Sequence, residues 1–265
     1  MLYRPRQYGR PHGTRGWSVA SIAGHVPWGL LYGPGIAFNQ EGSFMATFRV
    51  RGHDLDSSSP VDLAATAQRF ADAMLYLGDR WAMHAEVQRH ATASYPATDM
   101  PDPVTALVDA ERGDHYERPG VYFEPRQYIT FTYLPPQDVV ARTHRFLIAN
   151  APHGDVDYAR ELEAFEHTIA RIADQLAGAF HTVERLTGEA FLTYLHSTVS
   201  TRWHPVGPFD TPAFLSYLLP DQHLRGGMYP QLGDDHLRVV GVKGMPAASW
   251  PEMHQAIAEL PFPLR

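Results

Sequence analysis

The longest amphipathic segment of the sequence sets the main limit on how this chain can fold. Apolar residues recur there at intervals of three or four: Tyr158, Leu162, Phe165, Ile169, Ile172, Leu176 and Phe180. Charged residues occupy many of the positions between them, which predicts a helix over about 157–180 with one apolar stripe along about six turns. We expect this stripe to lie across a β-sheet, and an oligomer seam is the alternative.

An alternating stretch near the N-terminus supplies the first strands of that sheet. Every second position from 44 to 50 is apolar: Phe44, Ala46, Phe48 and Val50. This is the pattern of a strand with one buried face. Residues 39–42 end in a glycine and can turn the chain back to residues 36–38. We therefore expect an N-terminal β-hairpin.

Further strands and helices alternate irregularly along the chain. Strand patterns occupy residues 80–89, 127–134 and 181–185, and a second hairpin flanks residues 233–235. Helix starts are indicated at 59–60, 104, 187 and 249–252, and residues 200–226 have the composition of a long surface excursion. Two hairpins among unevenly spaced helices favour an α+β fold, with a mainly antiparallel sheet packed by helices.

Composition excludes several classes of protein. The chain has 265 residues, 44% of them hydrophobic, which is enough for a substantial core. It contains no cysteine, so disulfides, thiolate nucleophiles and Cys-based zinc sites are excluded, in keeping with a reducing cytoplasm. The net charge of −7 argues against direct binding of nucleic acid. No apolar run approaches the roughly 20 residues of a spanning helix, and no signal peptide is expected.

The N-terminal segment differs from the rest of the chain in charge. The first 40 residues contain no Asp or Glu, and they carry four arginines among aromatic residues: Arg4, Arg6, Arg10, Arg15, Trp17 and Trp28 are the most prominent. We expect residues 1–25 to form a flexible basic and aromatic arm that contacts an anionic membrane surface or an acidic partner. An idle tail is the alternative. Residues 26–265 then form the α+β domain, either whole or as subdomains 26–136 and 137–265.

The sequence carries no motif of a nucleotide-hydrolysing site. A P-loop needs a lysine followed by Ser or Thr after a Gly-rich loop. The single lysine of this chain, Lys243, stands between Val242 and Gly244. No G-x-S-x-G elbow is present either. We therefore expect no catalytic residue and no cofactor-binding residue in this chain.

Fifteen histidines raise the question of a metal site. No H-E-x-x-H motif is present, and the candidate ligands lie in two short stretches: His53, Asp54, Asp56, His84 and Glu86. Residues 53–56 follow a strand and precede a helix, where such residues commonly form turns. We therefore expect no metal site, and a free-standing metal-dependent enzyme that uses these five residues is the alternative function.

The order and spacing of six segments resembles the N-terminal region of the TrbE-type conjugal-transfer ATPases of type IV secretion systems, the VirB/CagE/TrbE family. The segments are residues 42–55, 77–90, 95–112, 127–136, 183–200 and 239–253. The resemblance runs from about residue 26 to the end of the chain. None of these segments is a catalytic motif, so the resemblance depends on their succession.

The resemblance implies a large ATPase that energises pilus biogenesis and substrate transfer at the inner membrane. In that family a RecA-like motor hydrolyses ATP with Mg²⁺, and here it would lie beyond Arg265. This chain is then expected to be a non-catalytic docking and assembly region without a cofactor of its own. Its expected partners are inner-membrane components of the secretion complex and other copies of itself, as a hexamer or dimers of the full-length protein. Its expected location is cytoplasmic, peripheral to the inner membrane.

Overall fold

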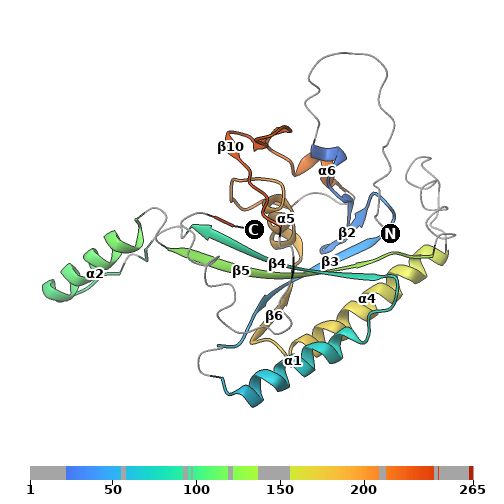
Figure 1. Ribbon diagram of the computed structural model, residues 1–265, viewed down its shortest axis with the longest axis horizontal. Coiled ribbons are helices and arrows are strands. Elements are labelled where there is room, and N and C mark those ends of the chain that lie inside the picture. The colour runs from blue at the N-terminus through green and yellow to red at the C-terminus, as the bar shows by residue number, and fades with distance from the viewer. Residues whose placement is uncertain are drawn as a thin grey trace, which may run out of the picture.

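The computed structural model describes residues 22–54, 58–91, 95–96, 98–118, 122–136, 156–208, 213–241, 244 and 263–264. At its centre is a seven-stranded sheet in the order β4-β5-β3-β2-β1-β7, with β6 beside β3 (Figure 1). The strands are β1 (Trp28–Tyr32), β2 (Ile36–Asn39), β3 (Phe44–Arg51), β4 (Trp81–Ala91), β5 (Phe123–Tyr133), β6 (Thr182–Arg185) and β7 (Ala213–Phe214). Their pairings are antiparallel.

Helices cover both faces of the sheet. The described helices are η1 (Ile22–Gly24), α1 (Pro60–Met74), α2 (Pro103–Tyr116), α4 (Val156–Leu176), α5 (Gly188–Ser197) and α6 (Leu215–Leu218), and all but α2 lie against the sheet. Figure 1 shows α1 and α4 side by side on one face, with α5 and α6 on the other. A small sheet of β8 (Leu224–Arg225), β9 (Gln231–Leu232) and β10 (Asp235–His236) follows α6. The arrangement is a three-layered α+β fold.

The alternating side chains of β3 divide the core into two parts. Phe44, Ala46, Phe48 and Val50 pack with the stripe of α4, whose Phe165, Ile169, Ile172 and Leu176 are fully buried. Met45 points to the other face and packs with Phe191, Leu192 and Leu195 of α5. The period of two along the strand therefore sends successive residues to opposite helical layers. The sheet is covered on both sides near its middle, where β3 lies.

The structure confirms the predicted hairpin, strands and long helix. Gly42 has a φ of 93°, a conformation that favours glycine and closes the turn between β2 and β3. Ser59 caps α1 in a capping box with Asp62. The long helix ends at Leu176, short of the predicted 180, and residues 177–180 form turns before β6. It packs across the sheet as expected.

Other predictions need correction or lie outside the described residues. The second hairpin exists, but β9 and β10 have two residues each, and residues 237–241 form no strand. The excursion over 200–226 contains the short elements β7, α6 and β8. Residues 1–21 and 245–262 are outside the described part of the chain, and they include most of the predicted arm and the last helix; the end of the arm forms η1. Among the described helices, none combines the length and the apolar character needed to cross a membrane.

Candidate functional site

The predicted docking residues fall into two groups in the structure. Arg4, Arg6, Arg10, Arg15 and Trp17 lie outside the described residues, so their role stays a prediction. Trp28 lies at the start of β1 and is only 3% exposed, within the core cluster that contains α5. The expectation that Trp28 contacts a partner does not fit this position, because its side chain points to the helix-covered face of the sheet.

The four described residues of the metal alternative are not brought together. His84 pairs with Thr130 in the sheet, and Thr130 pairs with Thr47 on β3. His53 lies six residues beyond Thr47 in the direction of β3, and six residues of extended strand span roughly 20 Å. Its ring contacts His181 at a centroid distance of 6.1 Å. Among the described residues, these side chains form no cluster with metal-ligand spacing.

The remaining members of that set have structural contacts. The backbone carbonyl of Asp54 accepts a hydrogen bond from the Ser58 hydroxyl at 2.5 Å, in keeping with a turn before α1. Asp56 lies outside the described residues. Glu86 accepts hydrogen bonds from the Tyr194 hydroxyl at 3.0 Å and from the Gln88 side-chain amide at 2.9 Å. These contacts indicate scaffold roles for Asp54 and Glu86.

Glu86 belongs to a polar network that holds α5 on the sheet. The hydroxyls of Thr47, Thr130 and Tyr194 form a chain of hydrogen bonds of 2.9 and 3.1 Å. The Gln88 side chain, 1% exposed, donates to Ser197 of α5 at 3.0 Å. A satisfied network of this kind fixes the helix in one position. A cleft of about 570 Å³ lies beside it, lined in part by Trp28, His84, Thr130 and Leu195.

The α2 helix carries an exposed apolar surface. Figure 1 shows α2 beyond one end of β4 and β5, away from the helices that cover the sheet. Val104, Leu107 and Val108 are 69%, 71% and 47% exposed. Their spacing of three and four positions places them on one side of the helix. No residue of α2 is buried, so its apolar side is turned to solvent.

An aromatic cluster joins α2 to the ends of the two strands. Tyr116 stacks on Tyr122 at 5.0 Å between ring centroids and meets Tyr95 edge-on at 5.6 Å. The Tyr95 hydroxyl donates to the carboxylate of Asp109 at 2.7 Å, and this hydrogen bond raises the pKa of Tyr95. Asp102 caps the helix by accepting from the amide of Thr105 at 2.8 Å. The aromatic contacts thus hold the last turn of α2, and Asp102 caps its first turn.

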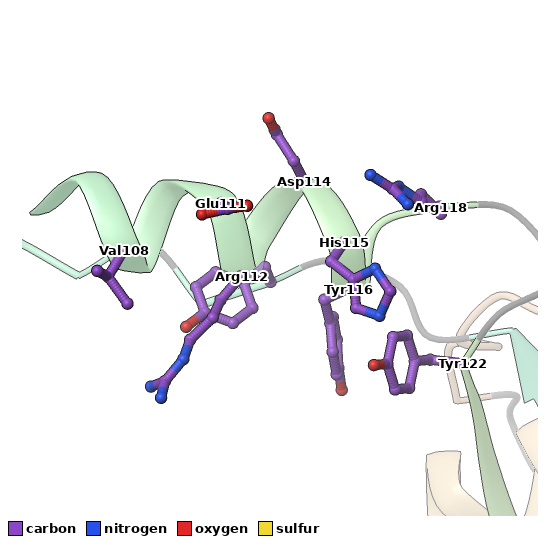
Figure 2. Close-up of a pocket in the computed structure, with 9 residues that line it drawn as sticks. Val108, Glu111, Arg112, Asp114, His115, Tyr116, Arg118 and Tyr122 are labelled. Carbon is purple, nitrogen blue, oxygen red and sulfur yellow. The ribbon is translucent and has the colours of Figure 1, made fainter.

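A pocket of about 650 Å³ lies along this helix and its base (Figure 2). It is lined by Tyr95, Val108, Glu111, Arg112, Asp114, His115, Tyr116, Arg118 and Tyr122. Aromatic rings and charges of both signs therefore border the apolar residues of α2. We call α2 with these aromatic residues the α2 arm. Surface apolar residues rimmed by polar groups are typical of sites that bind a protein segment.

The α2 arm carries no signal that sequence reasoning could have assigned to function. The sequence predicts this helix over 104–112, within the observed Pro103–Tyr116, and also shows the spacing of its apolar residues. Only the structure shows that this side of the helix has no neighbour among the described residues, because that depends on where the strands carry it.

These features define the class of the protein: an antiparallel α+β domain with a helix carried at the end of two long strands. Residues 35–140, from β2 to just beyond β5, match the family model for the N-terminal domain of the type IV secretion system ATPase VirB4/TrbE. The match includes the α2 arm and both strands that carry it. The structure and the comparison thus refer to the same region of the chain.

Two relatives bear the name TrbE. The conjugal transfer protein TrbE of Rhizobium radiobacter is 27% identical over 265 aligned residues, which cover 94% of this chain and 32% of that protein. A probable conjugal transfer protein of Sinorhizobium fredii, named as the first portion of a TrbE, is 32% identical over 120 residues, 44% of this chain and 80% of that protein. The chain belongs to the VirB4/TrbE family of type IV secretion ATPases and corresponds to the N-terminal region of these proteins. It spans about a third of the length of the R. radiobacter relative.

Proposed function

We propose that this chain is the docking and assembly region of a conjugative type IV secretion ATPase, and that the α2 arm is its main contact with a protein component of the inner-membrane complex. The observation that carries the proposal is the exposed apolar side of α2, a helix whose last turn packs against Tyr95 and Tyr122 and which is included in the family match. Apolar side chains on a preorganised helix bind a protein partner at low entropic cost.

A protein partner fits the arm better than a lipid surface does. The pocket beside the arm contains acidic as well as basic residues, Glu111 and Asp114 with Arg112 and Arg118. Helices that bind anionic lipid are rich in Lys and Arg on their polar face, and α2 contains no lysine and one arginine. Charges of both signs around an apolar centre favour a protein surface with complementary charges. The basic segment of residues 1–25 would add contacts to the anionic membrane surface through Arg4, Arg6, Arg10 and Arg15.

The proposal assigns no catalytic step to this chain. ATP and Mg²⁺ would bind in the RecA-like motor of the parent protein, since the sequence here has a single lysine and no P-loop. The parent ATPase would energise pilus biogenesis and substrate transfer from the cytoplasmic side of the inner membrane. Contacts between copies of this region would help to build its dimers or hexamer.

Binding to membranes that carry the secretion complex tests the proposal. The chain is incubated with inner-membrane vesicles from cells with or without the transfer genes, and the bound fraction is measured by flotation. We expect binding to need the transfer genes, and to fall at least tenfold in a Val104→Glu, Leu107→Glu double variant. A second variant with Arg4, Arg6, Arg10 and Arg15 changed to Gln should bind less tightly at low salt.

Val61→Glu is the matched control for the α2 variant. Val61 is also an exposed apolar helix residue, 76% exposed on α1, so the substitution makes the same chemical change elsewhere. We expect it to leave binding unchanged. Equal binding by the α2 double variant and the wild type would contradict the role of the arm, and equal binding to both vesicle types would contradict docking to the complex.

A further inference from the structure

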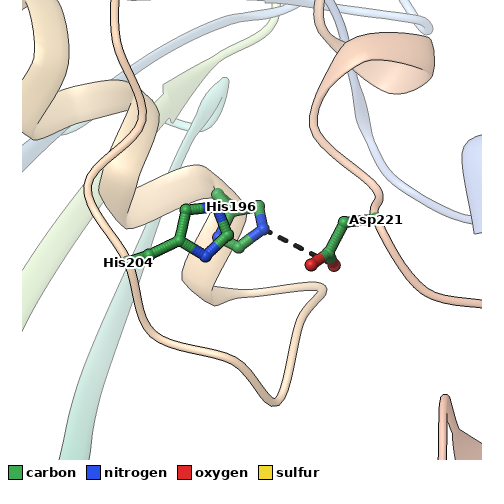
Figure 3. A group of neighbouring side chains, drawn as sticks. All are labelled: His196, His204 and Asp221. Atoms are coloured by element: carbon green, nitrogen blue, oxygen red, sulfur yellow. Dashed lines mark ion pairs between the residues drawn. The ribbon is translucent and has the colours of Figure 1, made fainter.

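Three potential metal ligands from separate segments converge beside the end of α5 (Figure 3). His196 lies in the last turn of α5, His204 in the loop that follows, and Asp221 just after α6. One candidate ligand atom from each lies within 4.8 Å of the other two. Nε2 of His196 is 3.5 Å from a carboxylate oxygen of Asp221, and the two imidazole rings are 4.3 Å apart between centroids. Among the described residues, this is the group with metal-ligand spacing.

Neighbouring contacts hold the backbone of all three ligands in place. The side-chain carbonyl of Gln222, next to Asp221, accepts from the amide of Thr201 at 2.8 Å and from the Ser200 hydroxyl at 3.1 Å. These bonds tie the segment after α6 to the loop after α5. Trp203, next to His204, lies under the guanidinium of Arg126 at 4.1 Å. The polar network described above fixes α5, so the site does not depend on one flexible loop.

One of the three groups is buried and the other two are exposed, so two of the side chains are free to adjust around a metal ion. The imidazole of His196 is 3% exposed, and the side chain of Asp221 is 31% exposed. His204 is exposed. A tetrahedral zinc site with bonds of about 2.0–2.2 Å places its ligand atoms about 3.4 Å apart. The ligand atoms, now within 4.8 Å of one another, therefore have to move closer together by about 1.4 Å at most. Rotation of the exposed His204 and Asp221 side chains can supply this movement.

We propose that His196, His204 and Asp221 bind one Zn²⁺ ion, with water in the fourth position. Imidazole nitrogens suit zinc and other late transition metals, whereas Mg²⁺ and Ca²⁺ prefer sites made of oxygen alone. The bound ion joins α5 to the loops on either side of β7 and α6. It therefore stabilises the helical layer opposite α1 and α4, independently of the α2 arm.

Zinc binding by the whole 265-residue chain, freed of any histidine tag, tests the proposal. Zinc content is measured after dialysis, affinity is measured by competition with a chromophoric chelator, and the melting temperature is recorded with and without Zn²⁺. We expect one equivalent of zinc, a higher melting temperature with Zn²⁺ and no such effect of Mg²⁺. A His204→Gln, Asp221→Asn double variant should bind zinc at least tenfold more weakly.

The two substituted residues are exposed, so the double variant should fold like the wild type, and circular dichroism checks this. His167→Gln is the matched control, because His167 is an exposed histidine on α4, on the opposite face of the sheet. It should bind zinc as the wild type does. Equal affinity in the wild type and the double variant, or equal stabilisation by Mg²⁺ and Zn²⁺, would overturn the proposal.

Discussion

At the scale of single residues, Tyr133 at the end of β5 has a raised pKa with consequences for stability. Burial of its ring, followed by the hydrogen bond from its hydroxyl to Glu161 of α4 at 2.8 Å, raises the pKa to about 12 from the ordinary 10.0. The folded state thus favours the protonated phenol. This contribution to stability is complete below pH 10 and is lost as the pH rises through about 12.

We therefore predict that the chain loses stability between pH 10 and about 12, and that Tyr133→Phe reduces this loss. The midpoint of urea unfolding, recorded at several pH values for both proteins, measures this loss of stability. Glu161→Gln should lower the pKa of Tyr133, which NMR of ring-labelled tyrosine can follow. A Tyr133→Phe variant with the same alkaline loss as the wild type would show that other groups dominate.

Gly35 is the position where a single added carbon meets the backbone of another element. A Cβ on Gly35 would lie 2.6 Å from the carbonyl oxygen of Leu186, which follows β6. Gly35→Ala must therefore displace β6 or the turn between β1 and β2. We predict a loss of about 1–3 kcal/mol in the free energy of unfolding. Gly24→Ala, where a Cβ meets nothing within 4 Å, is the control in the same urea titration.

At the scale of elements, Phe165 of α4 is the centre of an aromatic cluster between this helix and the sheet. Phe165 is fully buried and lies 5.4 Å from Phe44 and 5.5 Å from Trp81 between ring centroids. We predict that Phe165→Ala lowers the free energy of unfolding by about 3–5 kcal/mol, measured by urea titration. Glu163→Ala on the exposed side of α4 should change it by less than about 0.5 kcal/mol. Similar losses in both variants would mean that α4 does not pack as described.

The α2 helix should be less stable than the elements of the core, because it has no buried residue. Asp102 caps it through Thr105. Asp102→Ala should cost about 0.5–2 kcal/mol of helix stability, and the amides of residues 103–116 should exchange faster with solvent. Hydrogen exchange read by mass spectrometry measures this. Equal acceleration in β3 would show that the loss is global.

Much of the element scale could be predicted from the sequence, because local periodicity fixes these elements. The apolar stripe of α4, the alternating apolar residues of β3 and the Ser59 cap of α1 are each determined by residues that lie close together in the sequence. The contacts of the candidate site residues and the metal-ligand group could not be predicted in this way, because they join residues far apart in the sequence. Glu86 looked like a candidate ligand, and only the strand pairing shows that it belongs to the Tyr194 network. His196, His204 and Asp221 have no recognisable zinc spacing, so the expectation of no metal in this chain changes only with the structure.

At the scale of the whole molecule, the fold separates a rigid, two-sided core from one exposed helix. The helices on both faces bury the middle of the sheet, and β4 and β5 carry α2 away from it (Figure 1). The proposed docking function fits this combination, since an exposed helix can contact a partner while the core stays folded. The central claim is therefore that α2 contacts the membrane complex.

Site-specific photocrosslinking in cells tests this claim most directly. A photoreactive residue replaces Leu107 on α2 or, as the control, Val61 on α1, in cells that carry the remaining transfer genes. We predict that Leu107 gives a crosslink to an inner-membrane protein that disappears when the transfer genes are removed, and that Val61 gives none. A crosslink from Val61 but not from Leu107, or the same product from both, would contradict the account.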